Sequence, residues 1–294
     1  MIDLKEQLVN LQGNLKFTAN AIVEGFISGQ HKSPYHGFSV EFSDYKPYSN
    51  GDSINLLDWK VYSKTDRYYI KRYEDETNVR AYFLLDISNS MSFTSHNLKK
   101  IDYAKLLVAS LVNLSLKQRD ATGLVTFNHS IVDYLPAKSS SIWFNRILQI
   151  LEKVKCSDST NLSEVIFSFS SMLKKRSLVI IITDFFDDIE AINKALNFLK
   201  FNNHHCILFH IFDEKEIDFS YNGEYKLIDL ENSESMLVSP HTIRKDYLDK
   251  VNMFHVKLKE IVENLHFEYF QINTLTSVEM SLKDFLFARY KRYH

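Results

Sequence analysis

The chain carries the stretch VRAYFLLDISNS at residues 79–90, in which an apolar segment leads directly into a short polar loop. Val79–Leu85 is predicted to be a strand. It is followed at alternate positions by Asp86, Ser88 and Ser90. Alternate residues of an extended segment project to the same side, so these three side chains can point together. The stretch therefore predicts a strand whose carboxyl end presents one carboxylate and two hydroxyls.

Strands and helices alternate along the chain after residue 77. Residues 178–183 contain almost no polar side chain, which is typical of a strand buried on both faces. The other predicted strands are at residues 79–85, 123–127, 131–135 (a short edge strand), 205–211 and 268–272. The predicted helices are at residues 99–116, 142–154, 162–173, 189–199, 242–265 and 281–290. This alternation predicts an α/β domain over residues 77–294, with a doubly wound, mainly parallel sheet flanked by helices.

Residues 1–76 are predicted to form an N-terminal α+β extension packed on this domain. Apolar residues at helical spacing predict a helix over residues 3–28, and Arg67–Tyr73 has the composition of a strand. We interpret Gly51–Trp59 as a structural turn rather than a partner contact. Near the other end of the chain, Asp213–Val238 is predicted to be irregular, with two short strands.

Composition narrows the possible functions. The formal net charge of −2 provides no basic face for nucleic acid. The seven glycines form neither G-x-G-x-x-G nor a P-loop, which disfavours dinucleotide and P-loop nucleotide sites. The longest apolar run is far shorter than the roughly 20 residues of a membrane span, and no signal-peptide core follows Met1. With Cys156 and Cys206 outside any C-x-x-C pair, we expect a soluble cytoplasmic protein.

The carboxyl ends of the predicted parallel strands carry mostly oxygen donors. Ligands bind at those ends in doubly wound sheets. There Asp184 follows the central strand and Thr160 lies in the loop before the helix at residue 162. An all-oxygen set favours a hard cation, Mg²⁺ or else Mn²⁺ or Ca²⁺, over Zn²⁺. Helix capping is the competing interpretation for Thr160, and we assign Asp187 or Asp188 to capping.

The pattern D-x-S-x-S after a strand, with a threonine on a later loop and an aspartate after a further strand, resembles a known site. It is similar to the metal-ion-dependent adhesion site of von Willebrand factor A domains. The resemblance implies five metal ligands, which are Asp86, Ser88, Ser90, Thr160 and Asp184.

A second signature lies upstream, and it consists of GFSVEF at residues 37–42, YKPY at 45–48, GD at 51–52, DW at 58–59 and IK at 70–71. It is similar to the N-terminal signature of bacterial domain-of-unknown-function family fifty-eight, and the resemblance covers roughly residues 20–270. Members carry a von Willebrand factor A-like domain and are commonly encoded near MoxR-type AAA+ ATPases. The chain departs from the family at three positions: Asn55 replaces a usual Arg, Ser159 a frequent Gly and Asn161 a frequent Asp.

The resemblance implies a non-enzymatic module that holds a protein partner through a divalent metal. The implied partner is a MoxR-type AAA+ ATPase, and the implied role is the assembly or activation of other proteins. Two alternatives stay open, a Mg²⁺-dependent phosphatase-like enzyme and a metal-independent scaffold. The enzyme is disfavoured because Ser88 stands where haloacid-dehalogenase-type enzymes have a second, acid/base Asp. We therefore expect no catalytic residues, no organic cofactor, no nucleic acid partner and no membrane insertion.

Overall fold

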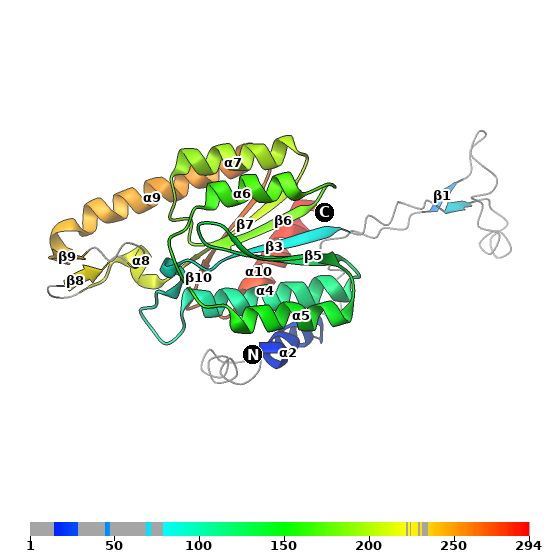
Figure 1. The fold of residues 1–294 in the computed structure, drawn as a ribbon, viewed down its shortest axis with the longest axis horizontal. Helices are drawn as coiled ribbons and strands as arrows, with labels where there is room; N and C mark the ends of the chain where they lie inside the picture. Colours follow the sequence, from blue (N-terminus) through cyan, green and yellow to red (C-terminus); the bar gives the residue numbers. More distant parts are fainter. Residues whose placement is uncertain are drawn as a thin grey trace.

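The computed structural model describes residues 15–28, 45–47, 69–71, 79–221, 223, 225–228, 230 and 235–293. Six strands form its main sheet, in the spatial order β10-β7-β6-β3-β4-β5 (Figure 1). Their bounds are β3 (Arg80–Asp86), β4 (Ala121–Phe127), β5 (Ile131–Lys138), β6 (Leu178–Thr183), β7 (His205–Phe212) and β10 (Glu268–Asn273). Neighbouring strands are parallel except β5, which is antiparallel to β4. The predicted doubly wound, mainly parallel sheet is thus confirmed.

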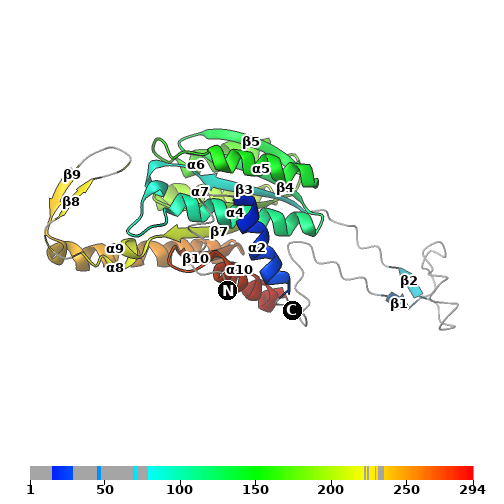
Figure 2. The same cartoon turned by 90° about the horizontal axis from the view of Figure 1, so that it is seen from below.

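Helices cover both faces of this sheet (Figures 1 and 2). The first layer contains α2 (Leu15–Ser28), α4 (Lys100–Lys117), α5 (Ser141–Lys153) and α10 (Val278–Tyr293). The second contains α6 (Leu162–Met172), α7 (Ile189–Phe201) and α9 (Pro240–Asn264). Each layer encloses its own apolar core against the sheet. The alternation of buried strands and amphipathic helices in the sequence is what divides the core in this way.

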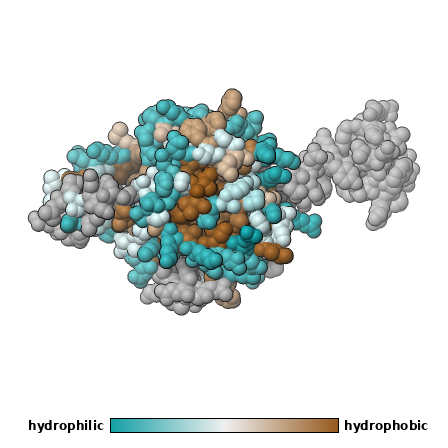
Figure 3. Space-filling model, viewed as in Figure 1, coloured by the Kyte–Doolittle hydropathy of each residue, from teal (hydrophilic) through white to brown (hydrophobic). Residues whose placement is uncertain are grey.

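Two elements, β6 and α4, are buried on most sides. All six residues of β6 are buried, because helices cover both faces of this central strand. Helix α4 is buried over most of its circumference, because it lies between the sheet and α2. Figure 3 shows an apolar area in the middle of the face seen in Figure 1, with hydrophilic residues around it. None of the described helices is long and apolar enough to cross a membrane.

Gly123 lies on β4 where the pairing with β5 shifts register. A Cβ atom at this position would lie 2.5 Å from Cδ1 of Tyr82 and 2.8 Å from the carbonyl oxygen of Leu135. The Tyr82 ring packs edge-on against Phe169, with 5.2 Å between ring centroids. Glycine at position 123 therefore makes room for a buried aromatic ring beside the antiparallel edge of the sheet.

Some boundaries differ from the prediction. Strand β5 continues to Lys138, three residues beyond the predicted end. The segment 213–238 contains the predicted two short strands, β8 (Tyr225–Ile228) and β9 (Ser235–Val238), and also a helix that was not predicted, α8 (Glu214–Asp218).

In the N-terminal part, β1 (Tyr45–Pro47) pairs antiparallel with β2 (Tyr69–Lys71). Strand β2 lies inside Arg67–Tyr73, the segment predicted to be a strand. Residues 3–14 of the predicted first helix, the turn at 51–59 and the GFSVEF signature lie outside the described residues. The domain division at residue 76 stays a prediction.

Candidate metal centre

The candidate site lies at the point in the sheet where the order of successive strands reverses. Strand β3 is flanked by β4 on one side and β6 on the other, and such a switch point opens a crevice at the carboxyl ends of the strands. Asp86 is the last residue of β3, and Asp184 directly follows β6. Both carboxylates are buried, with side chains close enough for Asp184 to affect the ionisation of Asp86.

Asp86 is surrounded by neutral hydrogen-bond donors. Its Oδ1 atom accepts a hydrogen bond from the backbone N–H of Ser88 at 2.8 Å. Its Oδ2 atom accepts from Oγ1 of Thr183 at 2.5 Å and from Oγ1 of Thr160 at 3.3 Å. Burial, with a further contribution from the Asp184 carboxylate, raises the pKa of Asp86 to about 7. The side chain therefore holds a proton more readily than an ordinary aspartate, and a cation would relieve the same penalty.

The predicted hydroxyl ligands lie beside this carboxylate. The Oγ atoms of Ser88 and Ser90 are 3.0 Å apart. Ser88 directly precedes a turn of 3-10 helix at Asn89–Ser92, and Ser90 lies within that turn. The backbone N–H of Asn89 donates to the carbonyl oxygen of Asp158 at 2.9 Å. This bond ties the loop after β3 to the loop that carries Thr160. The structure thus brings all five predicted ligands to one edge of the sheet.

The competing capping roles are resolved by the helix starts. Helix α6 is capped by Asn161, whose side chain accepts a hydrogen bond from the backbone N–H of Glu164. Thr160 is not the cap and instead faces Asp86. Helix α7 is capped by Asp188, which confirms one of the two assignments that we made for that position.

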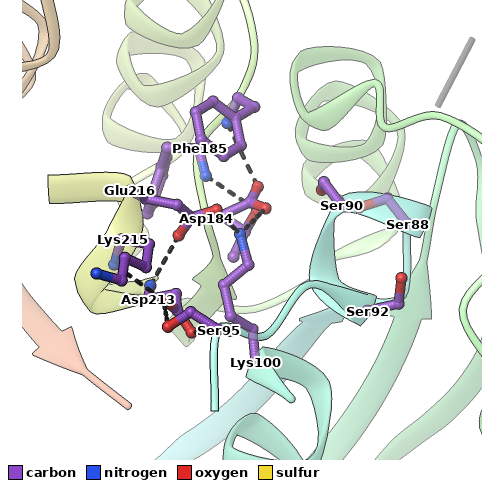
Figure 4. A network of polar contacts seen from close by, with 12 residues as sticks. Ser88, Ser90, Ser92, Ser95, Lys100, Asp184, Phe185, Asp213, Lys215 and Glu216 are labelled. Carbon is purple, nitrogen blue, oxygen red and sulfur yellow. Dashed lines mark hydrogen bonds and ion pairs between the residues drawn. The ribbon is translucent and has the colours of Figure 1, made fainter. Parts of the chain in front are cut away.

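Asp184 has a charged partner, whereas the described residues give Asp86 only neutral ones. The Nζ atom of Lys100, at the start of α4, lies 2.8 Å from Oδ2 of Asp184 and 2.5 Å from Oε1 of Glu216 (Figure 4). The Lys100 side chain is fully buried, and its ammonium lies 5.1 Å from the centroid of the Phe186 ring. Burial alone would lower the pKa of Lys100, but the two carboxylates outweigh it and hold the pKa above its ordinary value.

Glu216 is fixed by the short helix α8. Its Oε2 atom accepts a hydrogen bond from the backbone N–H of Asp213 at 2.7 Å, which completes a capping box. Burial raises the pKa of Glu216, and the Lys100 ammonium opposes that shift. A buried cation thus links the beginning of α4 to the ends of β6 and β7.

A cavity of about 480 Å³ lies next to this ion-pair cluster. Asp184 and Glu216 form part of its wall. Most of the remaining wall is apolar or aromatic, and its residues are Phe185, Phe186, His210, Ile211, Phe212, Ile217, Tyr247, Val251, Phe254 and His255, with Asp187 and Lys250 as further charged groups. Phe185 has a φ of 56°, a strained conformation for a bulky residue, directly after Asp184.

The donor set matches a hard divalent cation. It contains two carboxylates and three hydroxyls, which are ligands that Mg²⁺, Mn²⁺ and Ca²⁺ accept. Among the described residues, no three His, Cys, Asp or Glu side chains lie together as a metal cluster. This finding concerns only His, Cys, Asp and Glu side chains. It does not bear on a site made largely of hydroxyls.

Sequence reasoning missed Lys100 and Glu216, although both left a signal. Lys100 lies four residues before Ala104, on the apolar stripe of α4, where a lysine needs a buried partner. Asp213 and Glu216 have the spacing of a capping box, which would have predicted α8.

The model of the family described as "Protein of unknown function DUF58" matches residues 44–255. The chain belongs to this family. The match covers most of the sheet and the whole of the candidate site. No curated protein matches the chain.

Several solved structures are similar to parts of this chain. The conserved hypothetical protein BatB of Bacteroides thetaiotaomicron is 15% identical, with a TM-score of 0.48, over 73% of this chain and 99% of that one. The SpRpn10 VWA domain is 12% identical, with a TM-score of 0.46, over 70% of this chain and 94% of that one. Manganese-loaded TRAP protein of Plasmodium vivax is 16% identical, with a TM-score of 0.34, over 45% of this chain and 56% of that one. The predicted family is confirmed.

Proposed function

We propose that this DUF58 protein is a non-enzymatic interaction module that binds a divalent cation and, through it, a carboxylate of a protein partner. The ion is Mg²⁺, or else Mn²⁺ or Ca²⁺. Its ligands are Asp86, Ser88, Ser90, Thr160 and Asp184.

One observation carries this proposal: among the described residues, the buried Asp86 carboxylate accepts its hydrogen bonds from hydroxyls and an N–H. A buried carboxylate without a cation is disfavoured, and the raised pKa of Asp86 expresses this. When bound, a divalent cation supplies the missing positive charge. Because most of its ligands would be neutral hydroxyls, the ion would retain the capacity to attract a further anionic ligand.

We further propose that the partner is a MoxR-type AAA+ ATPase or a client of one, in the cytoplasm. The support for this partner is the family resemblance, since members are commonly encoded near such ATPases. Support for the compartment comes from Cys156 and Cys206, which are both free thiols in the structure. Free thiols fit a reducing compartment.

The metal-independent scaffold has one observation in its favour. Lys100 already provides a positive charge to Asp184, so half of the site has a counter-ion of its own. Calorimetric titration of the full chain with Mg²⁺ and Mn²⁺ separates the two functions. The absence of binding at millimolar ion would favour the scaffold.

The decisive variant is Asp86→Asn, which keeps the size of the side chain and removes its charge. We expect it to abolish Mg²⁺ binding and Mg²⁺-dependent association with the MoxR-type ATPase. Asp187→Asn, at the same edge of the sheet but outside the ligand set, is the matched control and should keep both. Association that persists unchanged in Asp86→Asn and in chelator would refute the metal role. Mg²⁺-dependent turnover of phosphate esters that is lost in Asp86→Asn would instead favour the enzyme.

A further inference from the structure

We propose that Lys100 is a tethered counter-ion that competes with the divalent cation for Asp184, and that it thereby keeps the affinity of the site for the free ion low. The inference rests on the proposed function and adds a regulatory part to the same site. Its basis is the geometry of three charges, of which Lys100 and Asp184 are buried and Glu216 is partly buried.

Lys100 is held where a helix does not favour it. It is the first residue of α4, and the positive end of the helix dipole disfavours a cation there. Its side chain is fully buried, and its ammonium lies 5.8 Å from the ring centroid of Phe93 and 5.1 Å from that of Phe186. Two carboxylates are therefore needed to keep this charge in place, and one of them is a proposed metal ligand.

The hydrogen bond from Lys100 reduces the negative charge with which the Asp184 carboxylate can attract an ion. Oδ2 of Asp184 accepts it at 2.8 Å, so part of the negative charge of this carboxylate is already neutralised. A divalent cation that binds Asp184 is also repelled by the neighbouring ammonium. Both effects weaken the binding of the free ion.

Glu216 provides a second carboxylate with which Lys100 can remain paired when an ion binds Asp184. Its Oε1 atom lies 2.5 Å from Nζ of Lys100, while its Oε2 atom is fixed by the backbone of Asp213. When the ion takes Asp184, Lys100 retains a carboxylate partner and does not become an isolated buried charge. The exchange therefore avoids the large penalty for an unpaired buried ion.

This arrangement predicts opposite effects for two substitutions. Lys100→Met removes the competing charge and should raise the affinity for Mg²⁺ about tenfold. Glu216→Gln leaves Asp184 as the only carboxylate of this cluster that pairs with Lys100. It should therefore lower the affinity for Mg²⁺ about threefold or more. If the two side chains only maintained the shape of the site, both substitutions would lower the affinity.

The experiment is a calorimetric titration of the full chain with Mg²⁺, in the wild type and each variant. Lys117→Met removes an equal charge from the exposed end of the same helix and should leave the affinity unchanged. If Lys100→Met does not fold, the double variant Lys100→Met/Glu216→Gln is compared with Glu216→Gln alone. The double variant should bind Mg²⁺ about tenfold more tightly.

Each outcome decides between the two proposals. Tighter binding in Lys100→Met, or binding that only this variant shows, supports the competition. Equal or weaker binding in Lys100→Met overturns the competition. If Asp86→Asn still abolishes binding in that case, the metal site itself stands. Absence of binding in the wild type and in every Lys100 variant overturns both.

Discussion

Asp86 and Asp184 lie at the ends of adjacent strands of one sheet, yet they are stabilised by different means. Asp86 accepts hydrogen bonds from hydroxyls and an N–H, and its pKa is raised to about 7. Asp184 accepts a bond from the ammonium of Lys100. The comparison shows that one half of the site lacks a positive charge while the other half already contains one. It also explains why an incoming cation would gain most at Asp86 and meet competition at Asp184.

The largest change in the free energy of unfolding is expected at Asp184, the half of the site that pairs with Lys100. In chelator, Lys100→Met should lower the free energy of unfolding by about 3–5 kcal/mol, because it leaves the buried Asp184 and the partly buried Glu216 without their counter-ion. Urea unfolding measures this value, and added Mg²⁺ should restore part of it. Lys117→Met should stay within about 0.5 kcal/mol of the wild type. A loss below about 1 kcal/mol for Lys100→Met would show that the ion pair is not the main support of Asp184.

A change of opposite sign in the free energy of unfolding is expected at Asp86, the half of the site that accepts hydrogen bonds from hydroxyls. Asp86→Asn should raise the free energy of unfolding at pH 7.5 in chelator by about 1–2 kcal/mol, because it removes a charge that burial disfavours. Folded Asp86 keeps its proton until about pH 7, whereas an unfolded aspartate loses it near pH 4. The wild type therefore loses stability as the pH rises through this window, and the variant does not. The difference should be smaller at pH 5, and a difference that is equal at both pH values would contradict the assignment.

The smallest effects distinguish the two threonines that face Asp86. The bond from Thr183 is 2.5 Å long and that from Thr160 is 3.3 Å. Thr183→Val should therefore destabilise the apoprotein by about 1 kcal/mol, and Thr160→Val by about 0.5 kcal/mol or less. Mg²⁺ affinity should respond in the reverse order, because only Thr160 is a proposed ligand. Equal affinity in Thr160→Val and wild type would remove Thr160 from the ligand set.

Much of the fold could be predicted from the sequence because its signals are local. The run of apolar residues at 178–183 and the alternation after residue 77 indicated a buried parallel sheet. The short helix α8 was missed because its five residues carry no buried apolar face. Its only local signal was the capping box.

The sequence could predict those residues of the candidate site that lie at or directly after the end of a strand. Asp86 and Asp184 could be placed because parallel strands end at one edge. The pairing of Lys100 with Glu216 could not be placed, because it joins residues 116 positions apart. No periodicity in the sequence encodes such a contact. The role of Thr160 depended on which residue caps α6, and two adjacent cap-forming residues leave that choice open until the backbone is known.

The close contact at Gly123 has an evolutionary consequence. Any side chain there would meet the ring of Tyr82, and a smaller residue at position 82 would relieve only that contact. The carbonyl oxygen of Leu135 would remain 2.8 Å from the new Cβ atom, and a backbone atom cannot be substituted away. Among descendants of this chain, position 123 is therefore expected to stay glycine for as long as β5 pairs with β4 in this register. A lineage that loses this glycine should also have rebuilt the edge of its sheet.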